Sequence, residues 1–181
     1  NLILDGGPVH TGVETTIVDM TVEPPMILRP GAVTKEMLEE TVGEVSVDHT
    51  ILTADSKTPP KAPGMKYRHY APRAEMTVVE GSLEKVVDKI SELAAARERE
   101  GHRTGIIATR ETMDRYTSRN VKCIGTREDE STVAANLYAI LRDFDDDGTE
   151  FIYSEAFASD GIGSAVMNRL LKAAGHHVIN V

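Results

Sequence analysis

Two groups of residues in this sequence could do chemistry on a small charged molecule. The first group begins with the adjacent hydroxyls of Thr15 and Thr16, which lead into an apolar run and could orient a polar substrate. Further along, Arg29 stands directly before a Pro-Gly pair, where its planar guanidinium could bind a phosphate or a carboxylate. A turn followed by a surface arginine is the simpler interpretation, since threonine is common in strands.

The second group lies between Pro63 and Pro72 and is unusually rich in cations and rings for an acidic protein. Its members are Lys66, Tyr67, Arg68, His69 and Tyr70. Proline framing restricts a loop, so the cations could approach anionic phosphates while an aromatic ring packs on a base or on a neighbouring sheet. A docked interdomain linker is the alternative, and both descriptions can hold together.

The elements that must position the first group lie in a β-rich segment, residues 1 to 32. Three short apolar runs, separated by Gly-Gly-Pro and Glu-Pro-Pro breakers, are the expected strands: residues 2–4, 16–19 and 26–28. Thr34 then supplies the cap of a short helix that Gly43 ends. From Glu44 to Pro72 the periodicity is weak, which predicts an extended linker serving as a domain boundary, a functional loop, or both.

After Pro72 the pattern changes to strands that alternate with helices. The expected strands cover residues 76–79, 105–108, 121–124, 151–153 and 178–181. The expected helices cover residues 82–100, 131–144 and 162–174, with a short helix near Glu111. This order predicts an α/β domain whose mostly parallel sheet has helices on both faces.

Several other features favour structural explanations. Cys123 lies in an apolar-leaning strand, so a buried thiol is favoured over a nucleophile. The acidic run from Asp143 to Asp147 is typical of a solvated helix end rather than a metal site. The spacing of His102, His176 and His177 does not favour a zinc site.

A Gly-x-Gly sequence opens the last helix, within Asp160 to Ser164. Such a helix start could admit a phosphate to its free N–H groups. However, the third glycine of a dinucleotide fingerprint is missing, and the carboxylates of Glu155 and Asp160 would repel an anion. A structural turn is therefore favoured here.

Composition places the chain among ordinary globular proteins, with 40% hydrophobic and 27% charged residues. The net charge of −9 argues against a broad nucleic-acid-binding surface. No apolar run approaches the roughly 18 residues of a membrane span, so a cytoplasmic protein is expected. The chain starts at Asn1 and enters an apolar run at once, which suggests the middle of a larger protein.

Three strings together, GVETTIVD at 12–19, ILRPG at 27–31 and PGMKYRHYAP at 63–72, closely resemble the threonylcarbamoyl-AMP synthase family in its two-domain form. Thr15 stands where that family usually has serine, and the hydroxyl is retained. The resemblance covers the whole chain. It implies that residues 1–32 are the end of a YrdC-like catalytic domain, 33–72 a helix and interdomain linker, and 73–181 a Rossmann-like accessory domain.

The resemblance also implies an activity: ATP, L-threonine and bicarbonate become L-threonylcarbamoyl-AMP and pyrophosphate. A separate transferase complex would use that product to modify tRNA, so this chain need not bind tRNA itself. Thr15 would contact L-threonine and Arg29 would contact ATP. The linker residues Lys66, Arg68, His69 and Tyr70 would close over the nucleotide. Magnesium is expected to accompany ATP, although no metal ligand in the chain stands out.

The catalytic residues of that family are expected upstream, in an N-terminal catalytic domain. Its Lys-x-Arg and Ser-x-Asn signatures match this chain only by chance, at Lys66 to Arg68 and at Ser118 to Asn120. The chain alone is therefore expected to be inactive. The alternative from another class is a stand-alone regulatory or nucleotide-binding Rossmann-like module.

Overall fold

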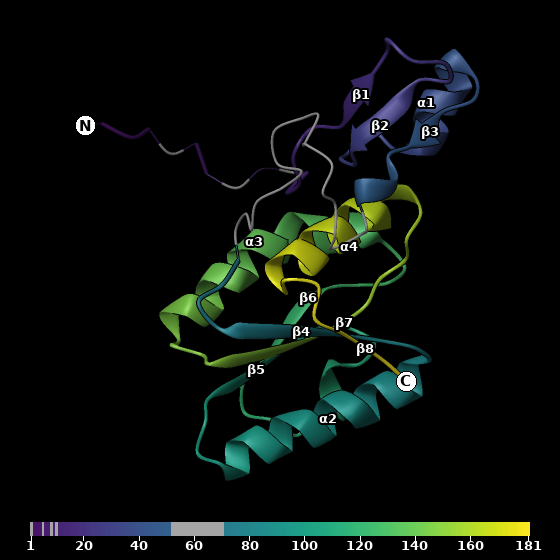
Figure 1. The fold of residues 1–181 in the computed structure, drawn as a ribbon. Coiled ribbons are helices and arrows are strands. Elements are labelled where there is room, and N and C mark those ends of the chain that lie inside the picture. Colours follow the sequence, from purple (N-terminus) through teal and green to yellow (C-terminus); the bar gives the residue numbers. More distant parts are fainter. Residues whose placement is uncertain (1, 5, 8, 10, 52–70) are drawn as a thin grey trace.

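The computed structural model describes residues 2–4, 6–7, 9, 11–51 and 71–181. Figure 1 shows the order of the layers: a small N-terminal unit, then helices α3 and α4, then a sheet, then helix α2. We use the term N-terminal unit for residues 11–51, and five-stranded domain for residues 71–181. The N-terminal unit thus lies on α3 and α4, on the side away from the sheet.

The sheet of the five-stranded domain is parallel throughout. Its strands are β4 (Glu75–Glu80), β5 (Thr104–Thr109), β6 (Val121–Gly125), β7 (Phe151–Glu155) and β8 (Val178–Asn180). They lie in the order β6-β5-β7-β4-β8, and every neighbouring pair is parallel. The expectation of a mostly parallel α/β sheet is confirmed.

Helices cover both faces of this sheet. They are α2 (Leu83–Arg99), α3 (Glu130–Asp146) and α4 (Gly161–Ala173), and a short 3₁₀ helix, η2 (Met113–Arg115), replaces the helix expected near Glu111. On the α3 and α4 face, Ile107, Leu137 and Phe144 are fully buried. On the α2 face, Val79, Ile90 and Ile106 are fully buried. Neighbouring residues of one strand, such as Ile106 and Ile107, therefore serve opposite cores.

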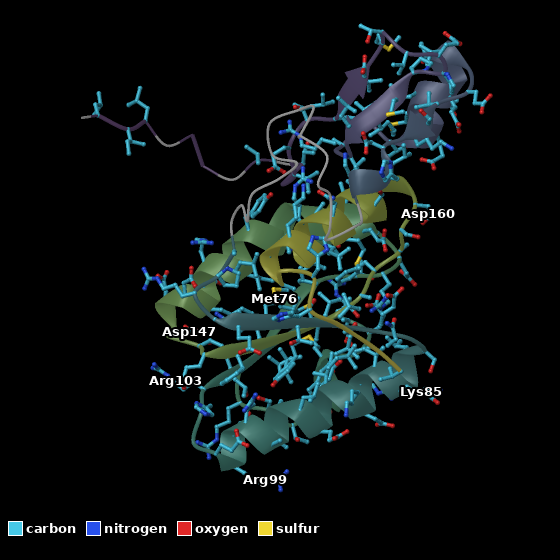
Figure 2. All side chains as sticks on the ribbon, in the orientation of Figure 1. Met76, Lys85, Arg99, Arg103, Asp147 and Asp160 are labelled. Atoms are coloured by element: carbon cyan, nitrogen blue, oxygen red, sulfur yellow. The ribbon has the colours of Figure 1, made fainter. Side chains whose placement is uncertain are left out.

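Figure 2 marks Met76 on β4, between the two helix layers, and its side chain is fully buried. On the same face of the sheet, the ring of Phe144 lies so close to β5 that a Cβ on Gly105 would be 2.4 Å from one of its carbons. Glycine in this strand lets the phenylalanine of α3 pack directly on the backbone.

The order of the strands differs from a simple doubly wound sheet. The consecutive strands β4 and β5 are not neighbours, because β7 lies between them and pairs with both. Sequence periodicity gave each of these strands but not this order, since the crossovers of parallel strands are non-local.

The N-terminal unit is a three-stranded mixed sheet with one helix. Strands β1 (Ile17–Asp19) and β2 (Met26–Arg29) are antiparallel, and β3 (Ser46–Val47) adds parallel to β2. Helix α1 (Lys35–Val42) and the 3₁₀ helix η1 (His49–Ile51) complete the unit. Its core contains three buried side chains, those of Ile27, Val45 and Ile51.

The predicted helix caps are confirmed, whereas two other expectations here are wrong. The hydroxyl of Thr34 accepts from Met37 N, and Gly43 follows the helix with a φ of 80°. The segment at residues 2–4 is no strand, and its three apolar side chains are 86–88% exposed. The linker expected from Glu44 is ordered up to Ile51, because Ser46 N donates to Pro25 O and begins the pairing with β2. The rest of that linker, 52–70, lies outside the described residues.

Candidate functional site

Thr15 and Arg29, the two site residues proposed from sequence in the N-terminal unit, are direct partners. The Arg29 Nε donates to Thr15 O at 3.0 Å, and its Nη2 donates to Thr15 Oγ1 at 3.0 Å. The pairing of β1 with β2 brings them together, since Ile17 faces Arg29 in the register. Two bonds from one planar group fix the orientation of the guanidinium.

The two adjacent hydroxyls have different roles. Thr16 Oγ1 donates to Val33 O at 2.6 Å, so this side chain fastens the strand to the segment before α1. Thr15 is exposed and its hydroxyl accepts from the half-buried Arg29. Of the two threonines, Thr15 is therefore the one placed to meet a ligand together with the arginine.

Gly31 explains why a Pro-Gly pair follows the arginine. A Cβ on Gly31 would lie 2.3 Å from Glu14 O and 2.5 Å from Thr16 N. Any larger residue would push the end of β2 away from the segment before β1 that carries Thr15. The glycine is thus a condition for the contact between Thr15 and Arg29.

Glu14, next to Thr15, joins the N-terminal unit to the five-stranded domain. Its carboxylate accepts from Tyr138 OH at 3.0 Å and from the buried Arg169. Burial would raise the pKa of the Glu14 carboxyl, but the charge and hydrogen bond of Arg169 outweigh it and the pKa is lowered. Burial, together with the adjacent Glu14, raises the pKa of the Tyr138 phenol, which stays protonated and donating.

Sequence reasoning missed this junction. Helix α4 is mostly apolar, and its residues 165 to 170 are all buried. Two of these buried residues, Asn168 and Arg169, are nevertheless polar. Two polar residues inside such a run were the available signal, because buried polar groups must find partners. What they would face could not be read from local spacing.

A carboxylate of this chain, that of Glu36, lies beside the helix start at Asp160 to Ser164. Asp160 makes no capping hydrogen bond, while the pKa of Glu36 on α1 is lowered by hydrogen bonds from its own backbone N–H and from the Thr34 hydroxyl, and least by the backbone N–H of Gly161. These hydrogen bonds favour the ionised form of Glu36 next to the positive end of α4. The structural turn favoured from sequence agrees with this arrangement, and a cavity of about 320 Å³ lies beside it between α1 and α4.

The carboxyl edge of the parallel sheet, where α/β proteins commonly bind ligands, carries a polar cluster. At its centre the fully buried Glu155 accepts from Tyr116 OH at 2.8 Å, from Arg127 Nη2 at 2.7 Å and from the hydroxyl of Thr112. Nearby, burial would raise the pKa of the Glu111 carboxyl, but hydrogen bonds led by the one from Thr126 lower it to about 2. Carboxylates thus fill this edge and oppose an anionic ligand.

A second cavity of about 520 Å³ lies at the opposite edge, by the amino ends of the strands. Figure 2 labels two of its lining residues, Arg103 and Asp147, at the same end of the sheet. Asp147 pairs with Lys122 at 2.7 Å, so charges of both signs surround this cavity. Mixed charge at this edge does not define one class of ligand.

The remaining sequence candidates are mostly structural. Cys123 lies half-buried on β6 with its thiol 3.6 Å from Gly125 O. The acidic run does end α3, but Asp145 is only 7% exposed and accepts from Arg73 N, so it is not wholly solvated. In the described part of the chain, no group of three or more His, Cys, Asp or Glu side chains is placed to hold a metal ion. Within the same residues, none of the helices has the length and apolar character of a membrane span.

The linker residues predicted to bind nucleotide, Lys66, Arg68, His69 and Tyr70, lie outside the described residues. Their roles stay predictions. The fold and the site together define an α/β protein whose parallel sheet has helices on both faces. A small unit that carries an arginine–threonine pair packs on two of these helices.

Comparison with known proteins places this class. Residues 33–175 match the family model described as "Threonylcarbamoyl-AMP synthase, C-terminal domain". Threonylcarbamoyl-AMP synthases of Bacillus subtilis and Pyrococcus abyssi are each 43% identical to the chain, over 98% and 99% of its length and 49% and 51% of theirs. A solved structure of P. abyssi Sua5 complexed with L-threonine superposes with a TM-score of 0.87 at 41% identity, covering 98% of this chain and 50% of that one. The chain therefore belongs to the threonylcarbamoyl-AMP synthase family.

The chain spans about half the length of these curated relatives. The matched range includes the helix and linker expected at 33–72 and most of the five-stranded domain, while residues 1–32 precede it.

Proposed function

We propose that this chain is the C-terminal part of an L-threonylcarbamoyladenylate synthase, a nucleotidyltransferase that converts ATP, L-threonine and bicarbonate to L-threonylcarbamoyl-AMP and pyrophosphate. The observation that carries the proposal is the double hydrogen bond between Arg29 and Thr15. It joins the two residues that the family resemblance assigns to different substrates. The named relatives, which are threonylcarbamoyl-AMP synthases, support the same activity.

In this proposal Thr15 contacts L-threonine through its hydroxyl, and Arg29 contacts ATP. The fixed guanidinium would stabilise negative charge on the phosphates as pyrophosphate leaves. Lys66, Arg68, His69 and Tyr70 would close over the nucleotide and exclude water from the reactive carbamate. With Thr15 just before β1 and Arg29 at the end of β2, the two contacts would bring threonine and ATP to the same end of the β1–β2 pair.

Residues 1–32 would complete a YrdC-like catalytic domain whose main part lies upstream, with 33–72 as connector and 73–181 as accessory domain. Support comes from exposed apolar side chains on the N-terminal unit, among them Met20, Val33 and Met37, which are 46–62% exposed. Several exposed apolar side chains on so small a unit are what a surface covered by another element would leave.

No step in this proposal is assigned to a metal ion. The described residues offer no cluster that fits one, so magnesium expected with ATP would need ligands on the phosphates or outside the described residues. The acidic charge of −9 supports a synthase that passes its product to a separate tRNA-modifying transferase complex without binding tRNA directly. A cytoplasmic location, where ATP and tRNA are found, is part of the proposal.

The alternative, a stand-alone nucleotide-binding Rossmann-like module, has less support. Its natural site is the carboxyl edge of the sheet, and there the carboxylates of Glu111 and Glu155 are already hydrogen-bonded within the domain. A nucleotide phosphate at this edge would meet negative charge.

The test uses the full-length protein with ATP, L-threonine and labelled bicarbonate. We expect pyrophosphate release that depends on L-threonine, and a labelled threonine adduct of AMP. The 181-residue chain alone is the control and is expected to be inactive. Nucleotide binding by residues 73–181, with no threonine-dependent turnover of the full-length protein, would support the alternative and remove the synthase proposal.

A further inference from the structure

Arg169 connects the five-stranded domain to the chain neighbours of both members of the arginine–threonine pair. The side chain lies on α4 and is 6% exposed. Its Nε donates to Glu14 Oε2 at 2.5 Å, and its Nη2 donates to Pro30 O at 3.3 Å. Glu14 immediately precedes Thr15, and Pro30 immediately follows Arg29. One guanidinium therefore holds the chain neighbours of both residues.

The orientation of Arg169 is itself fixed from the other side. Its Nη1 donates to Asn168 Oδ1 at 2.6 Å, and Asn168 Nδ2 donates to Ile51 O at 2.7 Å. Tyr138 on α3 donates to the same Glu14 carboxylate that Arg169 binds. Because Glu14, Asn168 and Arg169 each have more than one partner in this network, the guanidinium plane has little freedom to rotate.

The chain leading into Glu14 is also held by close packing. A Cβ on Gly12 would lie 2.2 Å from Ala134 O, so the backbone runs directly over α3. Val13 packs against the core beneath α3 and α4. Glu14 therefore reaches Arg169 from a position that the five-stranded domain determines.

The geometry points to Arg169 as a positioning residue: through Glu14 and Pro30 it sets the place of Thr15 relative to Arg29. The five-stranded domain thereby controls how the pair is presented to L-threonine and ATP. The consequence for catalysis rests on the proposed function, whereas the positioning itself does not. A lysine at residue 169 could bond Glu14 or Pro30 O, but it lacks the planar fork that reaches both.

Hydrogen exchange tests the positioning without any activity. In the 181-residue chain, Arg169→Ala is expected to raise amide exchange at residues 14–18 and 27–31. The matched control is Lys122→Ala, which removes a half-buried cation of the same domain that pairs with Asp147 and contacts neither segment. Unchanged exchange in Arg169→Ala, or an equal increase in the control, would overturn the inference.

Kinetics of the full-length protein test the consequence. Arg169→Ala is expected to lower kcat/KM by about tenfold to a hundredfold, the usual effect of a misplaced contact. KM should rise for ATP and for L-threonine together, because both members of the pair move, and Arg169→Lys should recover part of the loss. Arg29→Ala should raise KM mainly for ATP, which distinguishes misplacement of the pair from loss of one contact.

The two failures are distinguishable. A wild-type protein without threonine-dependent turnover would refute the proposed function, and hydrogen exchange would still decide the role of Arg169. An active wild type together with an Arg169→Ala variant as active as Lys122→Ala would refute the positioning role alone.

Discussion

The five-stranded domain and the N-terminal unit differ in how far they bury their apolar side chains. Every Val, Leu, Ile, Met, Phe and Tyr in residues 71–181 is buried or half-buried, whereas the N-terminal unit leaves Met20, Met37 and Val42 among its exposed side chains. The five-stranded domain has a core on each face of its sheet, and the unit has one small core. A three-stranded sheet with so little buried area gains most of its stability from what it packs against.

The difference assigns separate tasks to the two parts. The five-stranded domain is the rigid body, and the N-terminal unit carries the substrate-binding candidates on strands that this body holds through Glu14 and Pro30. Sites built on a supported surface keep their geometry better than sites on a free segment.

The largest effect is expected from the core of the five-stranded domain. Phe144→Ala leaves a cavity over Gly105 and should lower the free energy of unfolding by about 3–5 kcal/mol. Denaturant unfolding of the chain measures it. A loss below about 1 kcal/mol would mean that the domain repacks and is not the rigid partner described above.

A comparable truncation of a core side chain in the N-terminal unit should destabilise that unit alone. Ile27→Ala truncates one of the three buried side chains of the unit's core and should destabilise the unit by about 2–4 kcal/mol. Amide exchange should then accelerate in residues 17–47 and stay unchanged in strands β4, β5 and β7. If the whole chain unfolds at lower denaturant instead, the two parts form one cooperative body.

Arg29 tests the functional side of the comparison. In the full-length protein, Arg29→Ala should weaken ATP use by about 1.5–3 kcal/mol, the value of a charge-assisted contact. Arg29→Lys should restore only part of it, since lysine lacks the fork that binds Thr15 twice. An unchanged KM and kcat in Arg29→Ala would remove this arginine from the site.

The smallest effect concerns Lys172 on α4, beside the junction. Burial, together with the nearby Arg169, lowers the pKa of its ammonium group to about 8. The unfolded chain therefore binds more protons than the folded one between about pH 8 and pH 10.5, and the lysine's cost to stability is relieved as the pH rises through that window. From pH 7 to pH 10, the melting temperature of the wild type should rise relative to that of Lys172→Arg, because the arginine stays charged throughout. Parallel curves would contradict the shift.

Much of the fold followed from local patterns. Alternating strands and helices after Pro72, and the caps at Thr34 and Gly43, are properties of short stretches of sequence. Strand β3 was missed because two residues show no periodicity, and its position depends on pairing with β2. The strand order could not be predicted, since the pairings of β7 with β4 and β5, and of β8 with β4, join segments far apart in the chain.

Of the site, only the residues with a recognisable local sequence could be predicted. Thr15 and Arg29 carry recognisable neighbours in sequence, and the structure shows them in contact, although their binding roles stay predictions. Arg169 gives no local sign of its partners, because Glu14 and Pro30 are more than 130 residues away along the chain. Only the packing of α4 on the N-terminal unit reveals it.

The place of β7 between β4 and β5 has a consequence for synthesis on the ribosome. In the described part of the chain, the strands that pair with β4 are β7 and β8, so β4 has no neighbour in its sheet until residues 151 to 155 are made. Strands β5 and β6 can pair while they wait, but they cannot join β4 without the late central strand. Pairing at such separations is slow, and unpaired strand edges invite wrong partners. The two halves of the sheet are thus joined only when the middle strand, β7, inserts between β4 and the β5–β6 pair, which are made before it.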